Sequence, residues 1–289
     1  MQSARTLDLT GWIGRSEQSE DVVTKAPLRG LEALLDQDIG LDSGLAPPLA
    51  HWLYFLPTAW QSALDRDGHP VRGGFLPPVD LPRRMWAGGK LVFHAPLMIG
   101  SNITKRSTIT RIEEKTGESG DLVFVTVAHE ISCAGRLLVE EWQDIVYRGD
   151  TISSPAAARS LARALPGEPR KADAVRRVCP STPLLFRYSA LTFNSHRIHF
   201  DRDYARDVEG YPGLVVHGPL QATLMMTMFA AQNVGSACSF EFRARKPLFD
   251  RDPFNLCLAW AADGADLWTV GPDGEQAISA RVGTARVAA

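Results

Sequence analysis

The sequence has few cysteines and spreads them far apart. The 289-residue chain contains four. None lies in a C-x-x-C pair or near histidines at zinc-like spacing, which argues against a zinc site and a disulfide framework. They are Cys133, Cys179, Cys238 and Cys257. We therefore expect buried thiols in a protein of a reducing compartment.

Long hydrophobic runs and an excess of one charge are also missing. The longest apolar stretch, residues 222–231, is interrupted by Thr223 and Thr227 and falls far short of the ~20 residues of a membrane span. Residues 1–21 contain no apolar run suited to a secretory signal. Lys and Arg total 31 against 33 for Asp and Glu, a formal charge of −2, so no global field attracts a polyanion. We expect a cytoplasmic protein that binds neither nucleic acid nor membrane.

Signatures of several cofactor and hydrolase classes are absent as well. The sequence has no Gly-x-Gly-x-x-Gly and no P-loop. Ser189 and Ser195 do not lie in a Gly-x-Ser-x-Gly elbow, which disfavours a serine hydrolase. We predict no cofactor and no metal.

What is present is enough apolar material, 45% of residues, for one large domain or two small ones. Residues 151–180 are rich in Ala, Ser, Pro and Arg, with six basic residues against two acidic ones. This composition predicts a solvated linker, with a specific anion site as the alternative. The predicted organisation is therefore a domain at 1–150, a linker at 151–180 and a domain at 181–289.

The two predicted domains show the same order of elements. Each has helical residues followed by strand-like runs of alternating apolar residues, which predicts antiparallel sheets. The first has a helix at residues 31–35 and strands at 90–96, 103–113, 122–132 and 137–147. The second has helices at 187–191 and 219–231 and strands at 239–245, 254–261, 267–270 and 277–286.

A local similarity supports a duplication. Leu91-Val-Phe-His-Ala-Pro-Leu resembles Phe240-Glu-Phe-Arg-Ala-Arg-Lys-Pro-Leu. Each is a strand with an aromatic residue, a basic residue and Ala before Pro-Leu. Together with the linker, this predicts two similar α+β units.

The densest group of polar, titratable residues lies at residues 188–201 and places Asn194, His196 and His199 within six positions. Farther on, Gly218 lies just before the apolar helix. Unpaired N–H groups at a helix N-terminus can stabilise a developing oxyanion. From the residues alone, a structural hydrogen bonder is the favoured interpretation of His199, and Gly218 could form a tight turn, which is compatible with an oxyanion role.

These segments resemble the MaoC-like, R-specific enoyl-CoA hydratases of the hotdog fold. That family's signature is an Asp, a spacer, an Asn, two further residues and a His, followed later by Val-His-Gly. It falls here on Asn194, His196 and His199, then on residues 216–218. The Asn-x-His-Arg-Ile-His form resembles a subgroup with mitochondrial 3-hydroxyacyl-thioester dehydratases and bacterial mesaconyl-C4-CoA (3-methylfumaryl-CoA) and itaconyl-CoA hydratases. Residues 73–89 look like the accompanying non-catalytic repeat.

The resemblance implies an α+β double hotdog, in which each of two repeats wraps an antiparallel sheet around a central helix. It implies reversible addition of water to an α,β-unsaturated acyl thioester, with the second repeat catalytic and the first shaping the acyl pocket. Asn194 departs from the family because an amide cannot act as a base. His199 is then the main acid/base, Asn194 orients the water and the Gly218 N–H holds the thioester oxygen. His196 takes the position of the family's asparagine and is assigned to substrate binding, whereas His217 is expected to pack or cap.

Basic residues are the candidates for binding the rest of the substrate. Arg243, Arg245 and Lys246 are suited to coenzyme A phosphates, or equally to a solvated face. Arg83 and Arg84 are suited to a substrate carboxylate. This favours a dicarboxylic acyl group, with mesaconyl-C4-CoA or itaconyl-CoA as the leading substrates and coenzyme A as part of the substrate.

Three other functions stay open. The protein could be a dehydratase of fatty-acid metabolism, a thioesterase that releases free thiol, or a non-catalytic acyl-thioester binding protein. Acyl carrier protein could replace coenzyme A. Because a double hotdog mimics a dimer of single repeats, both a monomer and a homo-oligomer are compatible with the sequence.

Two further sets of residues are expected to be structural. The methionines on the apolar helix, Met225, Met226 and Met228, are expected to fill the core. The remaining histidines sit singly in strands or loops; these are His51, His69, His94 and His129.

Overall fold

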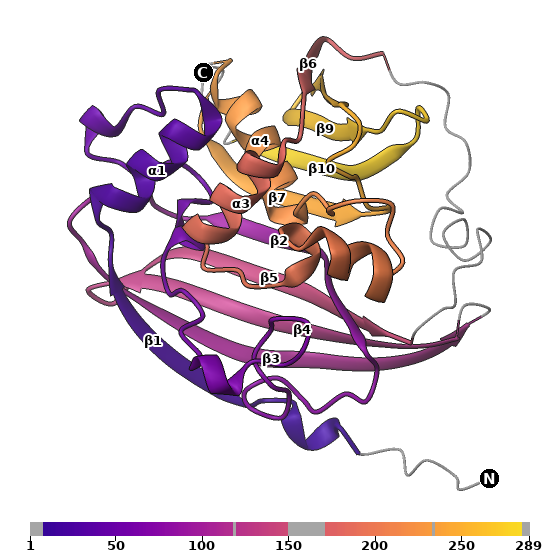
Figure 1. Ribbon diagram of the computed structural model, residues 1–289. Helices are drawn as coiled ribbons and strands as arrows, with labels where there is room; N and C mark the ends of the chain where they lie inside the picture. The colour runs from indigo at the N-terminus through magenta and orange to yellow at the C-terminus, as the bar shows by residue number, and fades with distance from the viewer. Residues whose placement is uncertain (1–7, 118–119, 150–170, 233–234, 285–289) are drawn as a thin grey trace, which may run out of the picture.

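The computed structural model describes residues 8–117, 120–149, 171–232 and 235–284. Their strands form one sheet in the order β1-β3-β4-β5-β2-β7-β10-β9-β8-β6, with antiparallel neighbours throughout (Figure 1). The strands of the first half are β1 (Ser16–Val22), β2 (Arg83–Phe93), β3 (Asn102–Gly117), β4 (Gly120–Cys133) and β5 (Arg136–Arg148). Those of the second half are β6 (Ala174–Val178), β7 (Ala237–Ala244), β8 (Phe254–Ala261), β9 (Gly264–Val270) and β10 (Gln276–Thr284).

The two halves of the sheet have the same topology. In each, the first strand of the half lies at the outer edge and the second lies at the centre of the whole sheet. The central strands β2 and β7 pair with each other, and Leu91 lies opposite Phe240. These strands carry the two similar sequence segments that predicted a duplication. The predicted pair of α+β units with antiparallel sheets is therefore confirmed.

Helices occupy equivalent places in the chain order of both repeats. In the first, α1 (Lys25–Leu35) lies between β1 and β2; in the second, α3 (Thr182–Leu191) and α4 (Gly218–Ala230) lie between β6 and β7. The α4 helix packs on β7, β8, β9 and β10 and is buried along nearly its whole length. Its methionines, Met225, Met226 and Met228, are buried in the core as predicted. The α1 helix buries one face and packs against α3.

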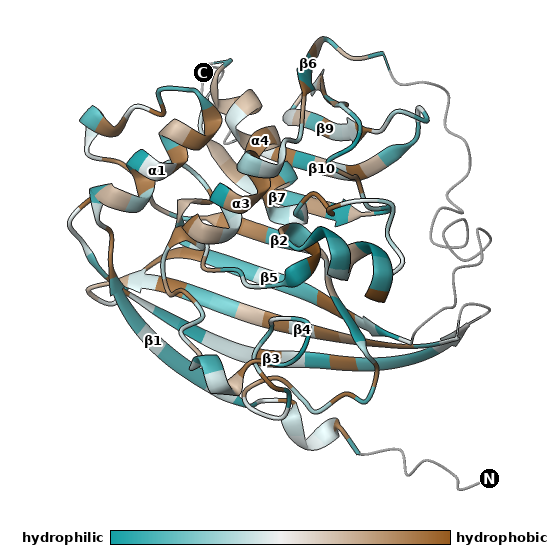
Figure 2. Cartoon of the chain, viewed as in Figure 1, coloured by the Kyte–Doolittle hydropathy of each residue, from teal (hydrophilic) through white to brown (hydrophobic). Residues whose placement is uncertain are grey.

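Two strands escaped the sequence prediction, and both are edge strands. β1 is polar and mostly exposed, and Figure 2 shows it in teal along most of its length. β6 lies inside the predicted linker, where it pairs with β8. The last part of 151–180 therefore belongs to the second half of the sheet, while residues 150–170 lie outside the described residues. Charged edge strands are common because they discourage pairing with other chains, and they lack an apolar alternation.

The long connection from α1 to β2 covers the sheet of the first repeat (Figure 1). Its residues Phe75, Leu76, Val79 and Leu81 pack in a separate apolar cluster with side chains of β3, β4 and β5. This connection also carries residues 65–70 toward the second repeat. Short helical turns lie at Thr10–Trp12, Leu41–Ser43, Ala50–Leu53, Gln61–Ala63, Arg197–His199 and Tyr204–Val208.

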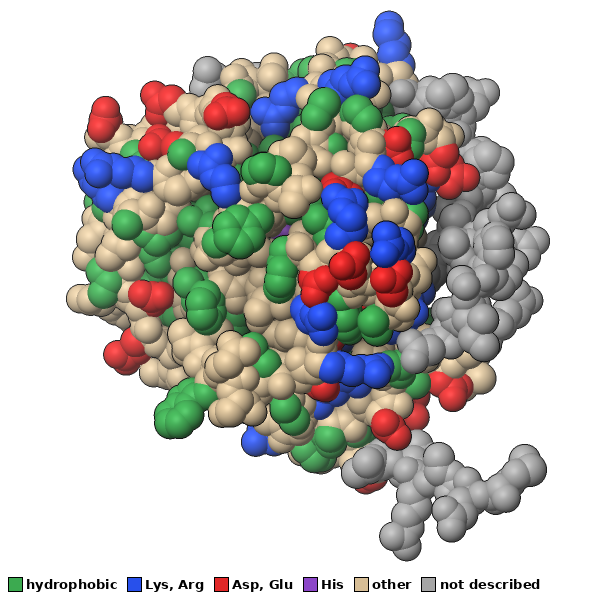
Figure 3. All heavy atoms as spheres, viewed as in Figure 1, with side chains coloured by type: hydrophobic (Ala, Val, Ile, Leu, Met, Phe, Trp, Pro, Cys, Tyr) green, Lys and Arg blue, Asp and Glu red, His purple; other side chains and the backbone are tan. Residues whose placement is uncertain are grey.

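The cysteines are all free thiols, but the expectation that they are buried is only partly right. Cys257 is buried, Cys133 and Cys238 are half-buried, and Cys179 is exposed. None of the described helices combines the length and the apolarity that crossing a membrane requires. Figure 3 shows basic and acidic side chains interspersed on the face that it draws, in keeping with the small formal charge.

Candidate active site

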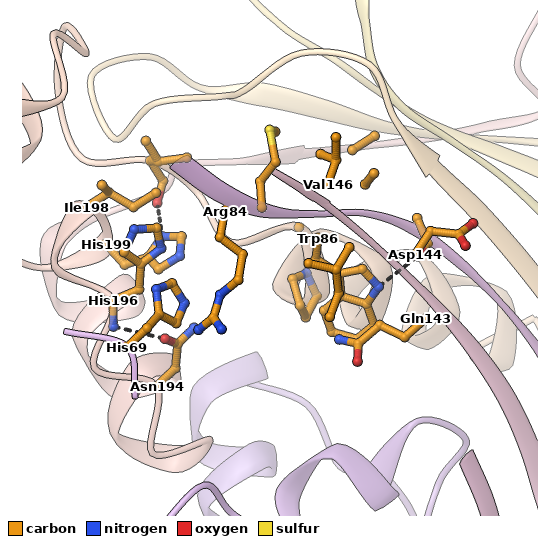
Figure 4. Close-up of a pocket in the computed structure, with 18 of the residues that line it drawn as sticks. His69, Arg84, Trp86, Gln143, Asp144, Val146, Asn194, His196, Ile198 and His199 are labelled. Atoms are coloured by element: carbon orange, nitrogen blue, oxygen red, sulfur yellow. Dashed lines mark hydrogen bonds between the residues drawn. The ribbon is translucent and has the colours of Figure 1, made fainter. Parts of the chain in front are cut away.

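A large cavity lies where the two repeats meet, and both contribute to its lining. Figure 4 shows His69 and Arg84 of the first repeat gathered with Asn194, His196 and His199 of the second. The structure thus brings the sequence-predicted site residues to one cavity. They are Asn194, His196, His199, Gly218, Arg83, Arg84, Arg243, Arg245 and Lys246.

The loop after α3 fixes Asn194. Its backbone N–H donates to the Ser189 carbonyl at 2.8 Å, and its side-chain oxygen accepts the His196 backbone N–H at 3.0 Å. An aspartate could accept the same bond, but the amide of Asn194 also carries two N–H donors. Asn194 is therefore suited to orienting a water or an oxygen of the substrate, not to taking a proton.

The geometry of His199 defines its protonation. Its Nδ1 lies 2.7 Å from the Val215 carbonyl oxygen. Because a carbonyl can only accept, Nδ1 carries the hydrogen, and Nε2 of the neutral ring has a free lone pair. Burial lowers the pKa of His199 to about 4. At neutral pH this side chain is thus a neutral imidazole with a basic nitrogen.

His217 packs flat on His199. The ring centroids are 3.7 Å apart and the planes differ by 19°. Ser189 Oγ lies 2.9 Å from His217 Nε2, and the side chain makes no cap hydrogen bond to α4. Burial and the neighbouring His199 and His196 hold the pKa of His217 well below its ordinary value. His217 therefore packs, as one of the two expectations had it, and holds the plane of the His199 ring.

These buried histidines predict a loss of stability in acid. In the unfolded chain the pKa of a histidine is near 6.5, whereas in the folded state burial lowers the pKa of His199 to about 4 and that of His217 well below its ordinary value. Below about pH 6.5 the unfolded state therefore binds more protons than the folded state. His199 alone lowers the free energy of unfolding by ~1.4 kcal/mol per pH unit between about pH 6.5 and pH 4, and His217 acts in the same direction. We expect the Tm, followed by circular dichroism, to fall steadily on acidification.

A matched pair of variants isolates this contribution. His199→Gln should make the decline of Tm with pH shallower than in the wild type. His94→Gln, at a partly exposed histidine outside this cluster, is the matched control. An equal pH dependence in wild type and His199→Gln contradicts the assignment.

Gly218 is the first residue of α4, one position earlier than predicted, and Pro219 follows it. The first N–H groups of a helix have no partner within the helix. A Cβ atom added at Gly218 would meet no atom within 4 Å, and the residue lines the cavity. The backbone here is accessible to a ligand oxygen, as an oxyanion site requires.

His69 does not stand alone as the sequence suggested. Its Nδ1 lies 2.9 Å from Asp67 Oδ2, and its backbone N–H donates to Asp67 Oδ1 at 2.8 Å. The ring centroids of His69 and His196 are 4.2 Å apart. In the sequence, this pair is visible only as an aspartate two residues before a histidine. The contact of His69 with His196 is what connects the pair with the site.

Asp67, His69 and His196 also offer ligand atoms within 4.8 Å of one another. Two imidazoles and a carboxylate are a common set for a transition metal. Here, however, the carboxylate already accepts two hydrogen bonds from His69, and the positive charge of Arg84 acts on both His69 and His196. Because that charge opposes a cation, we interpret the three residues as an acid–base cluster and not as metal ligands.

The basic candidates differ in their surroundings. Arg83 Nε lies 3.5 Å from Glu209 Oε2. Lys246 pairs with Asp273 and Glu275. Arg245 Nε donates to Ser279 Oγ at 3.4 Å, and Arg243 is exposed on β7. The side chain of Arg84 extends toward His69, His196 and Asn194 (Figure 4).

The chain matches a known family and is similar to curated proteins. Residues 49–250 match the family described as hydroxyacyl-thioester dehydratase type 2. Mesaconyl-C(4)-CoA hydratase of Chloroflexus aurantiacus is 49% identical over 282 residues, which cover 96% of this chain and 98% of that protein. The mitochondrial hydroxyacyl-thioester dehydratase type 2 of Schizosaccharomyces pombe is 28% identical over 284 residues, 86% of this chain and 91% of that protein.

Solved structures share the fold. HtdX of Mycobacterium tuberculosis superposes with a TM-score of 0.67 at 16% identity and covers 93% of this chain and 99% of its own. A second protein of that organism, described as having a double hotdog fold, gives a TM-score of 0.57 at 14% identity, with 93% and 95% covered. The predicted double hotdog is confirmed, and the chain belongs to the MaoC-like hydroxyacyl-thioester dehydratase type 2 family of hydratases and dehydratases.

Proposed function

We propose that this protein reversibly adds water to the double bond of a dicarboxylic α,β-unsaturated acyl-CoA, with mesaconyl-C4-CoA as its substrate. The observation that carries the proposal is a neutral imidazole, His199, in the same pocket as the guanidinium of Arg84. The 49% identity to a mesaconyl-C(4)-CoA hydratase supports it.

The reaction needs a base for water and a donor for the thioester oxygen. As the water oxygen bonds to Cβ, the His199 Nε2 takes its proton, and the double-bond electrons move onto the thioester oxygen. The Gly218 N–H stabilises that oxyanion, an interaction whose removal costs about 3 kcal/mol in other enzymes. Asn194 orients the water through its amide. Cα then gains a proton, which completes the addition of water.

Arg84 gives the site its preference for a second carboxylate. In mesaconyl-C4-CoA, which is 3-methylfumaryl-CoA, the free carboxylate is bonded to the carbon that water attacks. Its partner must therefore lie beside the base. Arg84 meets this condition next to His196 and Asn194, whereas Arg83 is paired with Glu209. A guanidinium binds a carboxylate through two parallel hydrogen bonds.

The remaining basic residues lie along β7 and the turn after it. Arg243, Arg245 and Lys246 line the same cavity, and we assign them to the phosphates of coenzyme A. The four free cysteines support a reducing, cytoplasmic location.

The test is a panel of thioesters. Purified protein is incubated with mesaconyl-C4-CoA, itaconyl-CoA or crotonyl-CoA, and enoyl absorbance, product mass and free thiol are followed. We expect hydration with an intact thioester and the highest kcat/KM on mesaconyl-C4-CoA. Thiol release without hydration identifies a thioesterase, and binding of all three without turnover identifies a binding protein; either result contradicts the proposal.

A further inference from the structure

A loop of the first repeat, residues 65–70, is hydrogen-bonded to the loop of the second repeat that carries His196 and His199. The Arg197 backbone N–H donates to the Asp67 carbonyl at 2.9 Å, and Ser195 Oγ donates to the Gly68 carbonyl at 2.5 Å. Gly68 has φ +90°, and a Cβ there would lie 1.8 Å from the Ser195 carbonyl oxygen. Only glycine permits this approach. The contact therefore places Asp67 and His69 firmly in the active site.

Asp67 fixes the orientation and the tautomer of His69. A carboxylate can only accept, so the Nδ1 that lies 2.9 Å from it carries the hydrogen and Nε2 is the nitrogen left for chemistry. Although burial raises it, the hydrogen bonds from His69 bring the pKa of Asp67 below its usual range. Asp67 is thus a carboxylate that stabilises an imidazolium at His69, the arrangement that orients catalytic histidines in other enzymes.

Among the described residues of the second repeat, no histidine is hydrogen-bonded to a carboxylate in this way. Hydration removes a proton from water and delivers one to Cα, at two different atoms of the substrate. Asn194 can do neither, and His199 hydrogen-bonds a carbonyl and not a carboxylate. The His196 ring lies between the two other histidines, 4.2 Å from His69 and 5.3 Å from His199. In the part of the site that the structure describes, the carboxylate-supported imidazole comes from the first repeat.

The charges around His69 respond to the substrate. Without substrate, burial and the positive charge of Arg84 lower the pKa of His69, and Arg72 adds a smaller effect in the same direction. The carboxylate of Asp67 acts in the opposite direction. A substrate carboxylate bound to Arg84 offsets that positive charge. Binding a dicarboxylic thioester should therefore favour the imidazolium of His69, which brings one proton into the site.

We propose that His69, oriented by Asp67, is a catalytic acid that protonates Cα after the carboxylate of the substrate has paired with Arg84. Water gives its proton to His199 Nε2 as its oxygen bonds to Cβ, and the electrons of the double bond form the enolate. The enolate then takes the proton from His69 Nε2 onto Cα. The proton gained by His199 returns to His69 by way of His196 or solvent, so the cycle adds one water and leaves the enzyme unchanged. This inference rests on the proposed function.

Proton uptake provides a test that needs no variant. Succinyl-CoA has the carboxylate but no double bond, and butyryl-CoA has neither. Their binding is measured by titration calorimetry near neutral pH in two buffers that differ in ionisation enthalpy. We expect succinyl-CoA, and not butyryl-CoA, to bring about one proton to the protein. Equal uptake with both, or none with either, contradicts the proposal.

Variants then test the chemical step. His69→Gln and Asp67→Asn should each lose the proton uptake and lower kcat on mesaconyl-C4-CoA by about 10²-fold, the usual effect of a general acid, with a smaller change in KM. His94→Gln, in the partly exposed pair with Glu140, is the matched control and should behave as wild type. If wild type hydrates mesaconyl-C4-CoA and a folded His69→Gln does so equally fast, His69 is not the acid. If wild type hydrates no thioester, the proposed function itself fails.

Discussion

His199→Ala is expected to lower kcat on mesaconyl-C4-CoA by about 10³-fold, because it removes the base that accepts the water proton. The prediction follows from the hydrogen bond of Nδ1 to Val215, which leaves Nε2 unprotonated, and from a pKa of about 4, which keeps the ring neutral at neutral pH. Initial rates of enoyl absorbance loss measure the effect.

The control for this variant is His94→Ala, whose histidine lies outside the cavity lining and should retain wild-type rates. Circular dichroism and thermal unfolding of His199→Ala establish that it is folded. A folded His199→Ala protein with the wild-type rate shows that another group takes the water proton.

Arg84→Gln is expected to change which thioester the enzyme prefers. The variant should lose about 10²-fold in kcat/KM on mesaconyl-C4-CoA, equivalent to about 3 kcal/mol, the upper range for a hydrogen bond to a charged group. Crotonyl-CoA has no second carboxylate, so its kcat/KM should change far less. The ratio of the two values measures the interaction directly.

Arg84→Lys separates charge from geometry. It keeps a cation but loses the fork that binds a carboxylate at two points, so its kcat/KM on mesaconyl-C4-CoA should lie between those of wild type and Arg84→Gln. Equal losses on mesaconyl-C4-CoA and crotonyl-CoA in both variants would assign Arg84 to a part of the substrate that the two thioesters share.

The fold was predictable where strands are buried and not where they are exposed. Residues 122–132 alternate between apolar and polar side chains because one face of β4 packs in a core, and the sequence located this strand almost to its ends. β1 and β6 lie at the two edges of the sheet. They carry charges instead of an apolar alternation, so β1 was missed and β6 was included in the linker.

The site shows the same division between local and tertiary information. Asn194, His196 and His199 lie within six positions, and a local motif was enough to bring them together. Asp67 and His69 lie in the other repeat, more than a hundred residues away, and no local pattern connects them with that motif. Only the contact between the two repeats reveals the pair.

The two neighbouring arginines show the limit of a pattern in another way. Arg83 and Arg84 were equal candidates for a substrate carboxylate, because sequence alone does not show what surrounds each side chain. The structure separates them, since Glu209 pairs with Arg83 while Arg84 extends into the histidine cluster.

The central claim is that water is added to Cβ of mesaconyl-C4-CoA in this pocket while the thioester stays intact. Incubation of the purified protein with mesaconyl-C4-CoA in ¹⁸O-labelled water, followed by mass spectrometry of the acyl-CoA, tests it most directly. The account predicts a coenzyme A thioester that has gained one labelled water, with the label in a hydroxyl group on Cβ. Recovery of unlabelled mesaconyl-C4-CoA, or of free coenzyme A with the label in a carboxylate, would contradict it.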